Sequence, residues 1–213
     1  MTWPYSYTSK PKVVRRTFFS FHYQVDVTRA HVVKNSWVTK EERKDAGFFD
    51  ASVFESKKRA GDDTLKRFLT ESLNGTSVTC VLIGGQTASR KWVRYELVRS
   101  FHRGNGLFGI RIHAIKNLDR PPQLGTYGEN PFDYLAYRVD TDNERVYWQE
   151  KNNDKWSGYD EVPSMALSDV AYNLNGNLYH TFSTLFHVYD WVLNGGYNNI
   201  NAWIDQAAKQ AGK

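Results

Sequence analysis

Residues 76–85, TSVTCVLIGG, decide the fold expected for this 213-residue chain. Apolar and β-branched residues fill the run without the alternation of a half-exposed strand, so it is expected to be a central parallel strand buried on both faces. The run ends in Gly84 and Gly85, at the position where a doubly wound sheet opens onto its ligand crevice. Cys80, the only cysteine of the chain, lies inside the run and is expected to be an inert, buried thiol.

The segments on either side of this strand alternate between strand and helix patterns. Before it, a strand is expected over about residues 13–21, a helix over 25–38, and a second helix that begins with Asp62 as its N-cap and stops near residue 74. After it, a helix is expected over 89–102 and a strand over 107–115, whose alternation of apolar and polar residues places it near a sheet edge. This order predicts an α/β, flavodoxin-like parallel sheet with helices on both faces.

The chain changes character at about residue 121, where prolines, glycines and asparagines break the pattern. Short aromatic strands around Tyr137, 145–150 and 156–159 predict a small β meander, and two helices are expected around 182–192 and 200–207. No charge-rich linker separates these elements from the first half. We therefore expect an N-terminal extension over 1–12, an α/β domain over 13–120, and a C-terminal aromatic extension over 121–213 that docks on that domain.

The composition favours a globular protein that binds an anionic ligand. Lysine and arginine total 28 against 23 acidic residues, which gives a net charge of +5, suited to a dinucleotide. There is no polybasic run, so nucleic acid is not an expected partner. No segment has the pattern of a signal peptide or the ~20 apolar residues of a membrane span, and we expect a cytoplasmic protein. Because motifs such as GxxxxGK[ST], GxGxxG, HExxH and CxxC are absent, P-loop phosphoryl transfer and zinc hydrolysis are disfavoured.

Glu96 is the strongest candidate for a catalytic residue. It lies one position away from the apolar stripe that marks the core face of the helix over residues 89–102, and four residues after Trp92. The carboxylate and the indole are therefore expected to share a face at the edge of the core, directed towards the crevice. The alternative is a solvated carboxylate that pairs with Arg99, which is the usual state of a helical glutamate.

The end of the first strand supplies further candidates. Phe18, Phe21 and Tyr23 could stack on a base or nicotinamide ring, and His22 could bond a ribose or a phosphate. The alternative is that the phenylalanines only fill the core and that His22 is a hydrogen-bonded structural histidine.

Two other groups of polar residues could likewise bind a ligand or have only a structural role. The segment formed by Asp50, Ala51 and Ser52 could supply polar groups to the rim of the crevice, or cap the start of a helix. Arg90 and Arg94 could bind a pyrophosphate, or remain solvated surface cations.

Three passages together resemble the TIR and TIR-like domain family of bacterial anti-phage defence, most closely the TIR proteins of Thoeris systems. They are TFFSFHYQ (17–24), SVTCVLIGGQT (77–87) and WVRYE (92–96), the last with the W-x3-E spacing of TIR helices that carry a catalytic glutamate. The phrases NPFDYLAY (130–137) and VYDWVLNGGYN (188–198) extend the likeness over about residues 13–203.

The resemblance implies an NAD nucleosidase and ADP-ribosyl cyclase that releases nicotinamide and makes a cyclic ADP-ribose isomer. This diffusible nucleotide signal would activate a separate effector protein after a phage-derived trigger. NAD would be the substrate, with no permanently bound cofactor and no metal, and TIR surfaces could form a homo-oligomer. The resemblance carries over Glu96 as the catalytic residue and, as substrate-binding residues, Trp92, Phe18, Ser20, Phe21, His22 and, by a looser match, Asp50 and Ser52. The alternative function is a non-catalytic TIR adaptor or nucleotide-sensing module.

Overall fold

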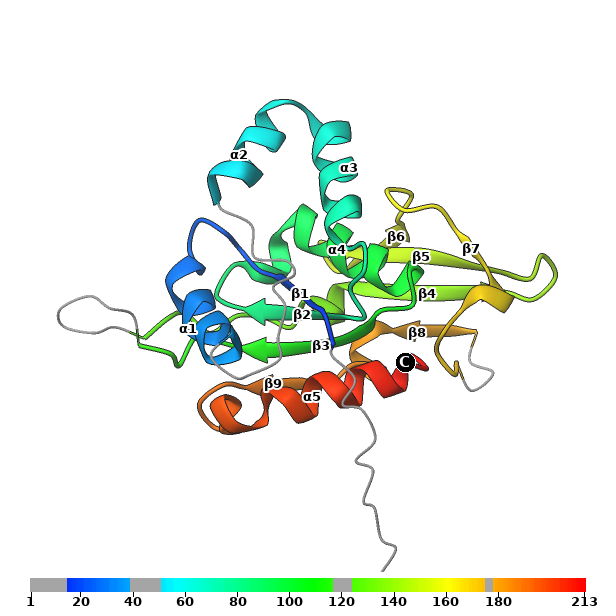
Figure 1. Cartoon of the computed structure of the whole chain (residues 1–213). Coiled ribbons are helices and arrows are strands. Elements are labelled where there is room, and N and C mark those ends of the chain that lie inside the picture. Colours follow the sequence, from blue (N-terminus) through cyan, green and yellow to red (C-terminus); the bar gives the residue numbers. More distant parts are fainter. Residues whose placement is uncertain (1–14, 39–50, 117–123, 175–177) are drawn as a thin grey trace, which may run out of the picture.

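A four-stranded parallel sheet forms the centre of the α/β part of the fold (Figure 1). The computed structural model describes residues 15–38, 51–116, 124–174 and 178–213. The sheet has the order β1-β2-β3-β9, formed by β1 (Thr17–Ser20), β2 (Val78–Ile83), β3 (Gly106–Arg111) and β9 (Val188–Asp190). Within the described residues, the expected α/β flavodoxin-like architecture is confirmed.

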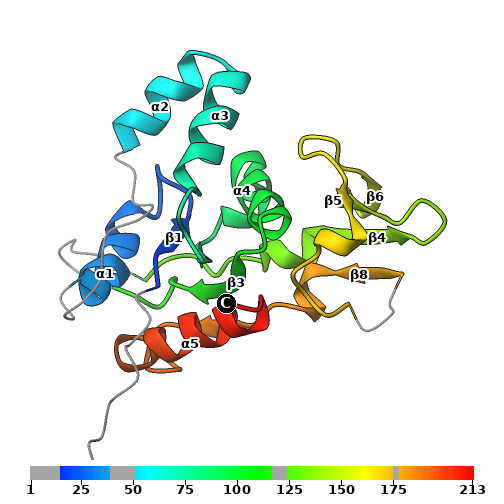
Figure 2. The same cartoon turned by 45° about the vertical axis from the view of Figure 1, so that its right-hand side comes forward.

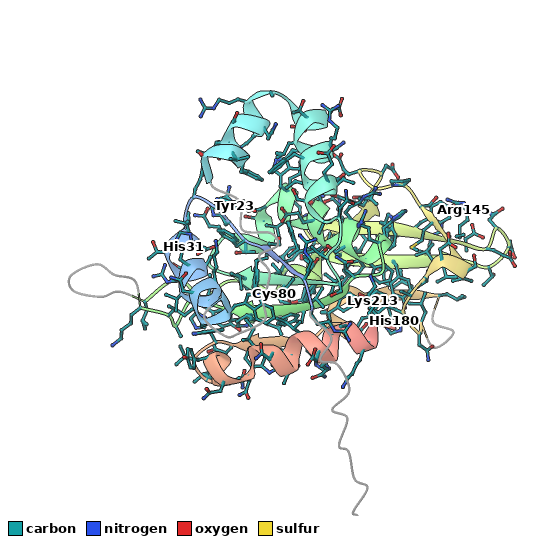
Figure 3. The ribbon with its side chains drawn as sticks, viewed as in Figure 1. Tyr23, His31, Cys80, Arg145, His180 and Lys213 are labelled. Carbon is teal, nitrogen blue, oxygen red and sulfur yellow. The ribbon has the colours of Figure 1, made fainter. Side chains whose placement is uncertain are left out.

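Strand β2 is the buried central strand that the sequence predicts. All six of its residues are buried, and it pairs in parallel with β1 on one side and β3 on the other. Cys80, labelled in Figure 3, lies in this strand, and its burial raises the pKa of the thiol well above the usual value. The expected burial of this thiol is confirmed, and a raised pKa disfavours the reactive thiolate.

Helices cover both faces of the sheet, as Figures 1 and 2 show. On one face α5 packs against β3 and β2 and contacts α1, and on the other α4 packs against the strands and contacts α3. Gly106 permits the close approach of α5, because a Cβ atom there would lie 2.3 Å from the Ala207 carbonyl oxygen. The helices are α1 (Val27–Val38), α2 (Ala51–Arg59), α3 (Asp62–Ser72), α4 (Lys91–His102) and α5 (Gly196–Gln210).

A five-stranded antiparallel sheet follows the α/β half and confirms the predicted meander. Asn153 and Asp154 both adopt a left-handed conformation in the tight turn between β5 and β6, as a type I′ hairpin turn requires. The strands are β4 (Leu135–Asp140), β5 (Arg145–Asn152), β6 (Lys155–Gly158), β7 (Met165–Ala166) and β8 (Tyr179–Thr181). Short 3-10 helices are η1 (Thr87–Ser89), η2 (Pro131–Tyr134), η3 (Leu167–Asp169) and η4 (Phe182–Thr184).

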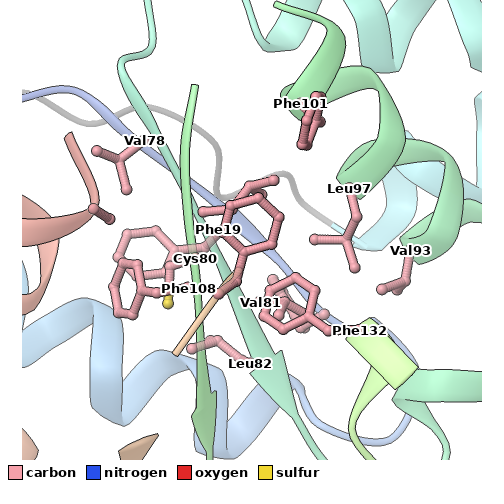
Figure 4. Packing of buried hydrophobic residues seen from close by; sticks show 14 of the residues in the cluster. Phe19, Val78, Cys80, Val81, Leu82, Val93, Leu97, Phe101, Phe108 and Phe132 are labelled. Carbon is pink, nitrogen blue, oxygen red and sulfur yellow. The ribbon is translucent and has the colours of Figure 1, made fainter. Parts of the chain in front are cut away.

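Phe101 joins the two sheets. It extends from α4 within the core cluster drawn in Figure 4, where Val93 and Leu97 lie along the same helix. Its ring contacts aromatic rings of the C-terminal half at centroid distances of 4.7–6.1 Å, those of Tyr137, Trp148, Tyr172, Phe182 and Phe186. The helix that bears Glu96 is thus packed between the parallel sheet and the C-terminal elements.

Three details of the expected fold are wrong. The helix expected over 182–192 is instead η4 followed by β9, because pairing with β3 outweighs the helical spacing of its aromatic residues. β3 is not at the sheet edge, because β9 covers it. Asp62 is the first residue of α3, whose N-cap is Gly61. The division at residue 120 stays a prediction, although β9 and α5, which follow it, complete the parallel sheet and its helical cover.

Candidate functional site

A pocket opens where the chain leaves β1, between α2 and the N-terminal half of α4. It is an open hollow with a cavity volume of about 60 Å³. Its lining comes from three segments that are far apart in sequence: Phe21, His22, Tyr23 and Gln24 after β1; Phe54, Glu55 and Lys58 of α2; and Arg90, Trp92, Val93 and Glu96 of α4 and its N-cap.

Glu96 contributes a buried carboxyl group to this pocket. Its side chain is 1% exposed, and its Oε2 accepts a hydrogen bond from the Ser20 hydroxyl at the end of β1. Among the described residues, the other oxygen, Oε1, has no hydrogen-bond partner. Nor does any ion pair there join Glu96 to Arg99. The alternative of a solvated helical glutamate is therefore wrong.

Burial changes the protonation of this carboxyl group. It raises the pKa of Glu96 to about 8, although the hydrogen bond from Ser20 acts in the opposite direction. At neutral pH Glu96 is therefore mainly the neutral acid. The phenol of Tyr23, also buried, has its pKa raised by burial and further by the charge of Glu96.

Aromatic rings form one wall of the pocket. The Tyr23 ring stacks on Phe54 of α2 at a centroid distance of 4.7 Å and lies 4.3 Å from the Phe21 ring. Trp92 is half-buried on α4 and has the Lys91 ammonium 4.9 Å above its ring. These rings offer flat apolar surfaces to a base or a nicotinamide ring.

Polar and charged side chains make up most of the rest of the lining, among them His22, Arg90 and Lys58. His22 is 8% exposed, and its pKa is lowered by burial and then by the charges of Arg90 and Lys58. Its neutral ring can donate one hydrogen bond and accept another. Glu55 has the opposite charge, and one of its oxygens accepts a hydrogen bond from the Gln24 amide at 3.1 Å.

Of the predicted site residues, the structure brings five together and leaves two out, and one lies outside the described residues. Ser20, Phe21, His22, Trp92 and Glu96 surround the pocket or bond a group that lines it. Phe18 is fully buried in the core and is not a lining residue. Ser52 lies exposed on α2 outside the lining, and Asp50 lies outside the described residues.

Two other expectations about the site need correction. Gly84 and Gly85 do not line the pocket. Gly84 instead accommodates the buried Asp26 carboxylate, whose Oδ1 would lie 2.2 Å from a Cβ atom at that position. Arg94 is neither a pyrophosphate ligand nor a surface cation: it is 8% exposed and points towards the antiparallel sheet, where it forms an ion pair with Glu150 at 3.2 Å.

Helix α2 supplies lining residues that the sequence analysis did not predict. Phe54 and Lys58 are four residues apart and so share one helical face, with Glu55 beside them. This spacing was visible in the sequence. It could not identify α2 as a pocket wall, because only the tertiary packing of Phe54 on Tyr23 brings that face to the end of β1.

Two negative findings, on metal-binding groups and on membrane-spanning helices, complete the description of the site. Within the described residues, no group of three or more histidine, cysteine, aspartate or glutamate side chains is arranged to hold a metal ion. In the same part of the chain, no helix is long and apolar enough to cross a membrane.

Comparison with known proteins gives two matches. Residues 18–117 match the family described as "Thoeris protein ThsB, TIR-like domain". A protein of Bacillus cereus (strain MSX-D12), ThsB1, whose name presents it as a candidate cyclic ADP-D-ribose synthase, is 41% identical over 194 residues. That alignment covers 91% of this chain and 100% of the relative, so the similarity includes the C-terminal elements as well as the α/β half.

Proposed function

Because the chain belongs to the Thoeris ThsB family of proteins with a TIR-like domain, we propose that it cleaves NAD at the nicotinamide bond and makes a cyclic ADP-ribose. Glu96 is the catalytic residue. The observation that carries this assignment is a carboxyl group that is 1% exposed and lines the pocket, with an Oε1 that has no hydrogen-bond partner among the described residues.

The chemistry requires little more than one such carboxylate. Nicotinamide carries a positive charge while it is bonded to the ribose, and it leaves as a neutral molecule with the bonding electron pair. It therefore needs no general acid. Positive charge develops on the ribose instead, and the ionised Glu96 stabilises that charge from a pocket with little water.

The raised pKa of Glu96 fits this role. Holding the acid neutral avoids an unpaired buried charge, and arrival of the cationic nicotinamide ring favours ionisation. NAD binding is then coupled to release of the Glu96 proton. The free Oε1 is the oxygen available to the ribose, while Ser20 holds Oε2 in place.

Cyclisation instead of hydrolysis requires that a nucleophile of the adenosine half reach the anomeric carbon before water does. A folded dinucleotide provides that advantage, because the two ends react within one molecule. Phe21, Tyr23 and Phe54 form an aromatic wall beside Glu96 that can hold a ring of the folded substrate and exclude water.

The proposal extends to a wider role, which membership of the family supports. NAD is a substrate and not a resident cofactor. The product acts as a diffusible signal for a separate effector protein, a phage-derived event triggers synthesis, and self-assembly through TIR surfaces accompanies the active state. The protein works in the cytoplasm. A non-catalytic adaptor is not favoured, because the pocket is open and Glu96 faces it.

The test is nicotinamide release from NAD by the purified chain and two variants. Glu96→Gln removes the charge at the pocket and is expected to abolish release. Glu71→Gln removes an equivalent charge from an exposed position on α3 and is expected to leave release unchanged. Equal release by the Glu96→Gln and Glu71→Gln proteins would reject the catalytic assignment.

A further inference from the structure

Three polar atoms without partners face the same pocket. Among the described residues, Glu96 Oε1, His22 Nδ1 and Arg90 Nε are buried and make no hydrogen bond, and all three residues line the pocket. Buried polar atoms of native proteins almost always have partners. A bound molecule that fills the pocket would supply them. The proposed role of Glu96 accounts for one atom only, so the other two call for a further part of the ligand.

One of these two atoms, Arg90 Nε, belongs to the residue at the positive end of a helix. Arg90 is the N-cap residue of α4, which is 12 residues long, and no side chain caps this end. The N-terminus of a helix attracts anions, because its first N–H groups are unpaired within the helix and carry the positive end of the helix dipole. Arg90 donates a hydrogen bond to the Gln86 side chain through Nη2, and its Nε has no partner among the described residues.

The side chains around this helix end are also cationic. The positive charges of Arg90 and Lys58 both lower the pKa of His22, so both act on its imidazole ring. Glu55 is the acidic lining residue nearby, and the Gln24 amide occupies one of its oxygens. The resulting field suits a compact dianion with several acceptor oxygens, and a diphosphate has that chemistry.

We propose that Arg90, Lys58 and His22, with the first turn of α4, form a diphosphate subsite of the pocket. This inference rests on the proposed function, since NAD carries its diphosphate between two riboses. Arg90 and Glu96 are six residues apart, which corresponds to about 9 Å along the axis of α4. A ribose with its 5′-diphosphate can bridge two groups held at this separation. The subsite therefore sets the position of the reacting ribose relative to the free oxygen of Glu96.

The subsite can be tested by equilibrium binding to the full chain that carries Glu96→Gln, which prevents turnover. The probes are NAD, ADP and nicotinamide riboside, the last without a diphosphate. Arg90→Gln in this background is expected to weaken NAD and ADP roughly 10- to 100-fold, because it removes a charge-assisted contact, and to leave nicotinamide riboside unchanged. Lys58→Gln is expected to act in the same direction and more weakly, since Lys58 is exposed.

The matched control is Arg59→Gln, which removes the next positive charge on α2 at an exposed position outside the pocket lining. It is expected to leave all three affinities unchanged. The inference is overturned if Arg90→Gln weakens nicotinamide riboside as much as NAD, if it spares ADP, or if none of the probes binds. If ADP binding depends on Arg90 but the wild-type chain does not cleave NAD, only the proposed function is rejected. NAD cleavage with Arg90-independent binding would reject only the subsite.

Discussion

Replacing Glu96 by glutamine is expected to make the protein more stable at neutral pH and, under the proposed function, to abolish NAD cleavage. The pKa of Glu96 is raised by burial from 4.5 to about 8, so between these pH values the folded protein holds a proton that the unfolded chain releases. Wild-type stability therefore falls by about 1.4 kcal/mol per pH unit across this window. The loss reaches about 3 kcal/mol at pH 7, and it is absent below pH 4.5, where both states are protonated.

Glutamine keeps the shape of the side chain and can still accept the hydrogen bond from Ser20, but it has no proton to lose. The assay is unfolding by heat and by urea at several pH values from 5 to 8, for the wild type, Glu96→Gln and the exposed control Glu71→Gln. At pH 7 the Glu96→Gln protein should melt roughly 6–12 °C higher than the wild type, from the usual relation between stability and melting temperature. At pH 5 the difference should fall below about 1 kcal/mol.

The shape of the pH dependence decides this prediction. A stability difference between Glu96→Gln and wild type that is the same at every pH would mean that Glu96 does not change protonation on unfolding. A variant less stable than the wild type at pH 7 would show that the carboxyl group is stabilised in its ionised form. Either result would refute the reasoning from burial.

Three further predictions follow from neighbouring contacts. Nicotinamide release should rise with pH as Glu96 ionises near its pKa of about 8, and Ser20→Ala should move this rise in kcat/KM to higher pH, because the Ser20 hydrogen bond lowers that pKa. Arg94→Ala should lower the free energy of unfolding by about 2–4 kcal/mol in urea titrations, because it removes a buried ion pair and several hydrogen bonds, while Arg94→Lys should recover part of the loss. Gly84→Ala should cost about 1–3 kcal/mol in the same assay, because its Cβ atom would meet the Asp26 carboxylate, and adding Asp26→Ala should relieve that clash.

Each of these predictions has a contrary outcome. An unchanged pH profile for Ser20→Ala would show that its hydroxyl does not act on Glu96. An Arg94→Ala protein as stable as the wild type would show that the contact between α4 and β5 does not stabilise the fold. A Gly84→Ala protein as stable as the wild type would mean that the Asp26 carboxylate can move away from the new Cβ atom without lowering the free energy of unfolding.

The parts of the fold that depend on local pattern could be predicted from the sequence. The apolar run around Cys80 identifies a strand buried on both faces, and the spacing of residues on α4 places Glu96 beside its core face. The W-x3-E spacing adds the expectation that Trp92 and Glu96 share a face, and both side chains line the pocket.

The parts that depend on distant partners could not be predicted. Strand β9 has three residues, and only β3, far away in the chain, makes it a strand. Its aromatic spacing alone indicates a helix. The same holds for Arg94, whose partners lie on β5, and for Lys58, which joins the pocket only because Phe54 packs against Tyr23.

The most direct measurement is mass spectrometry of the small molecules that phage-infected cells make from isotope-labelled NAD. Cells that express the wild type or Glu71→Gln are expected to accumulate labelled nicotinamide and a cyclic ADP-ribose after infection, and cells that express Glu96→Gln at the same level are expected to accumulate neither above background. Equal amounts of both products in the Glu96→Gln cells would contradict the assignment of this carboxylate to NAD cleavage.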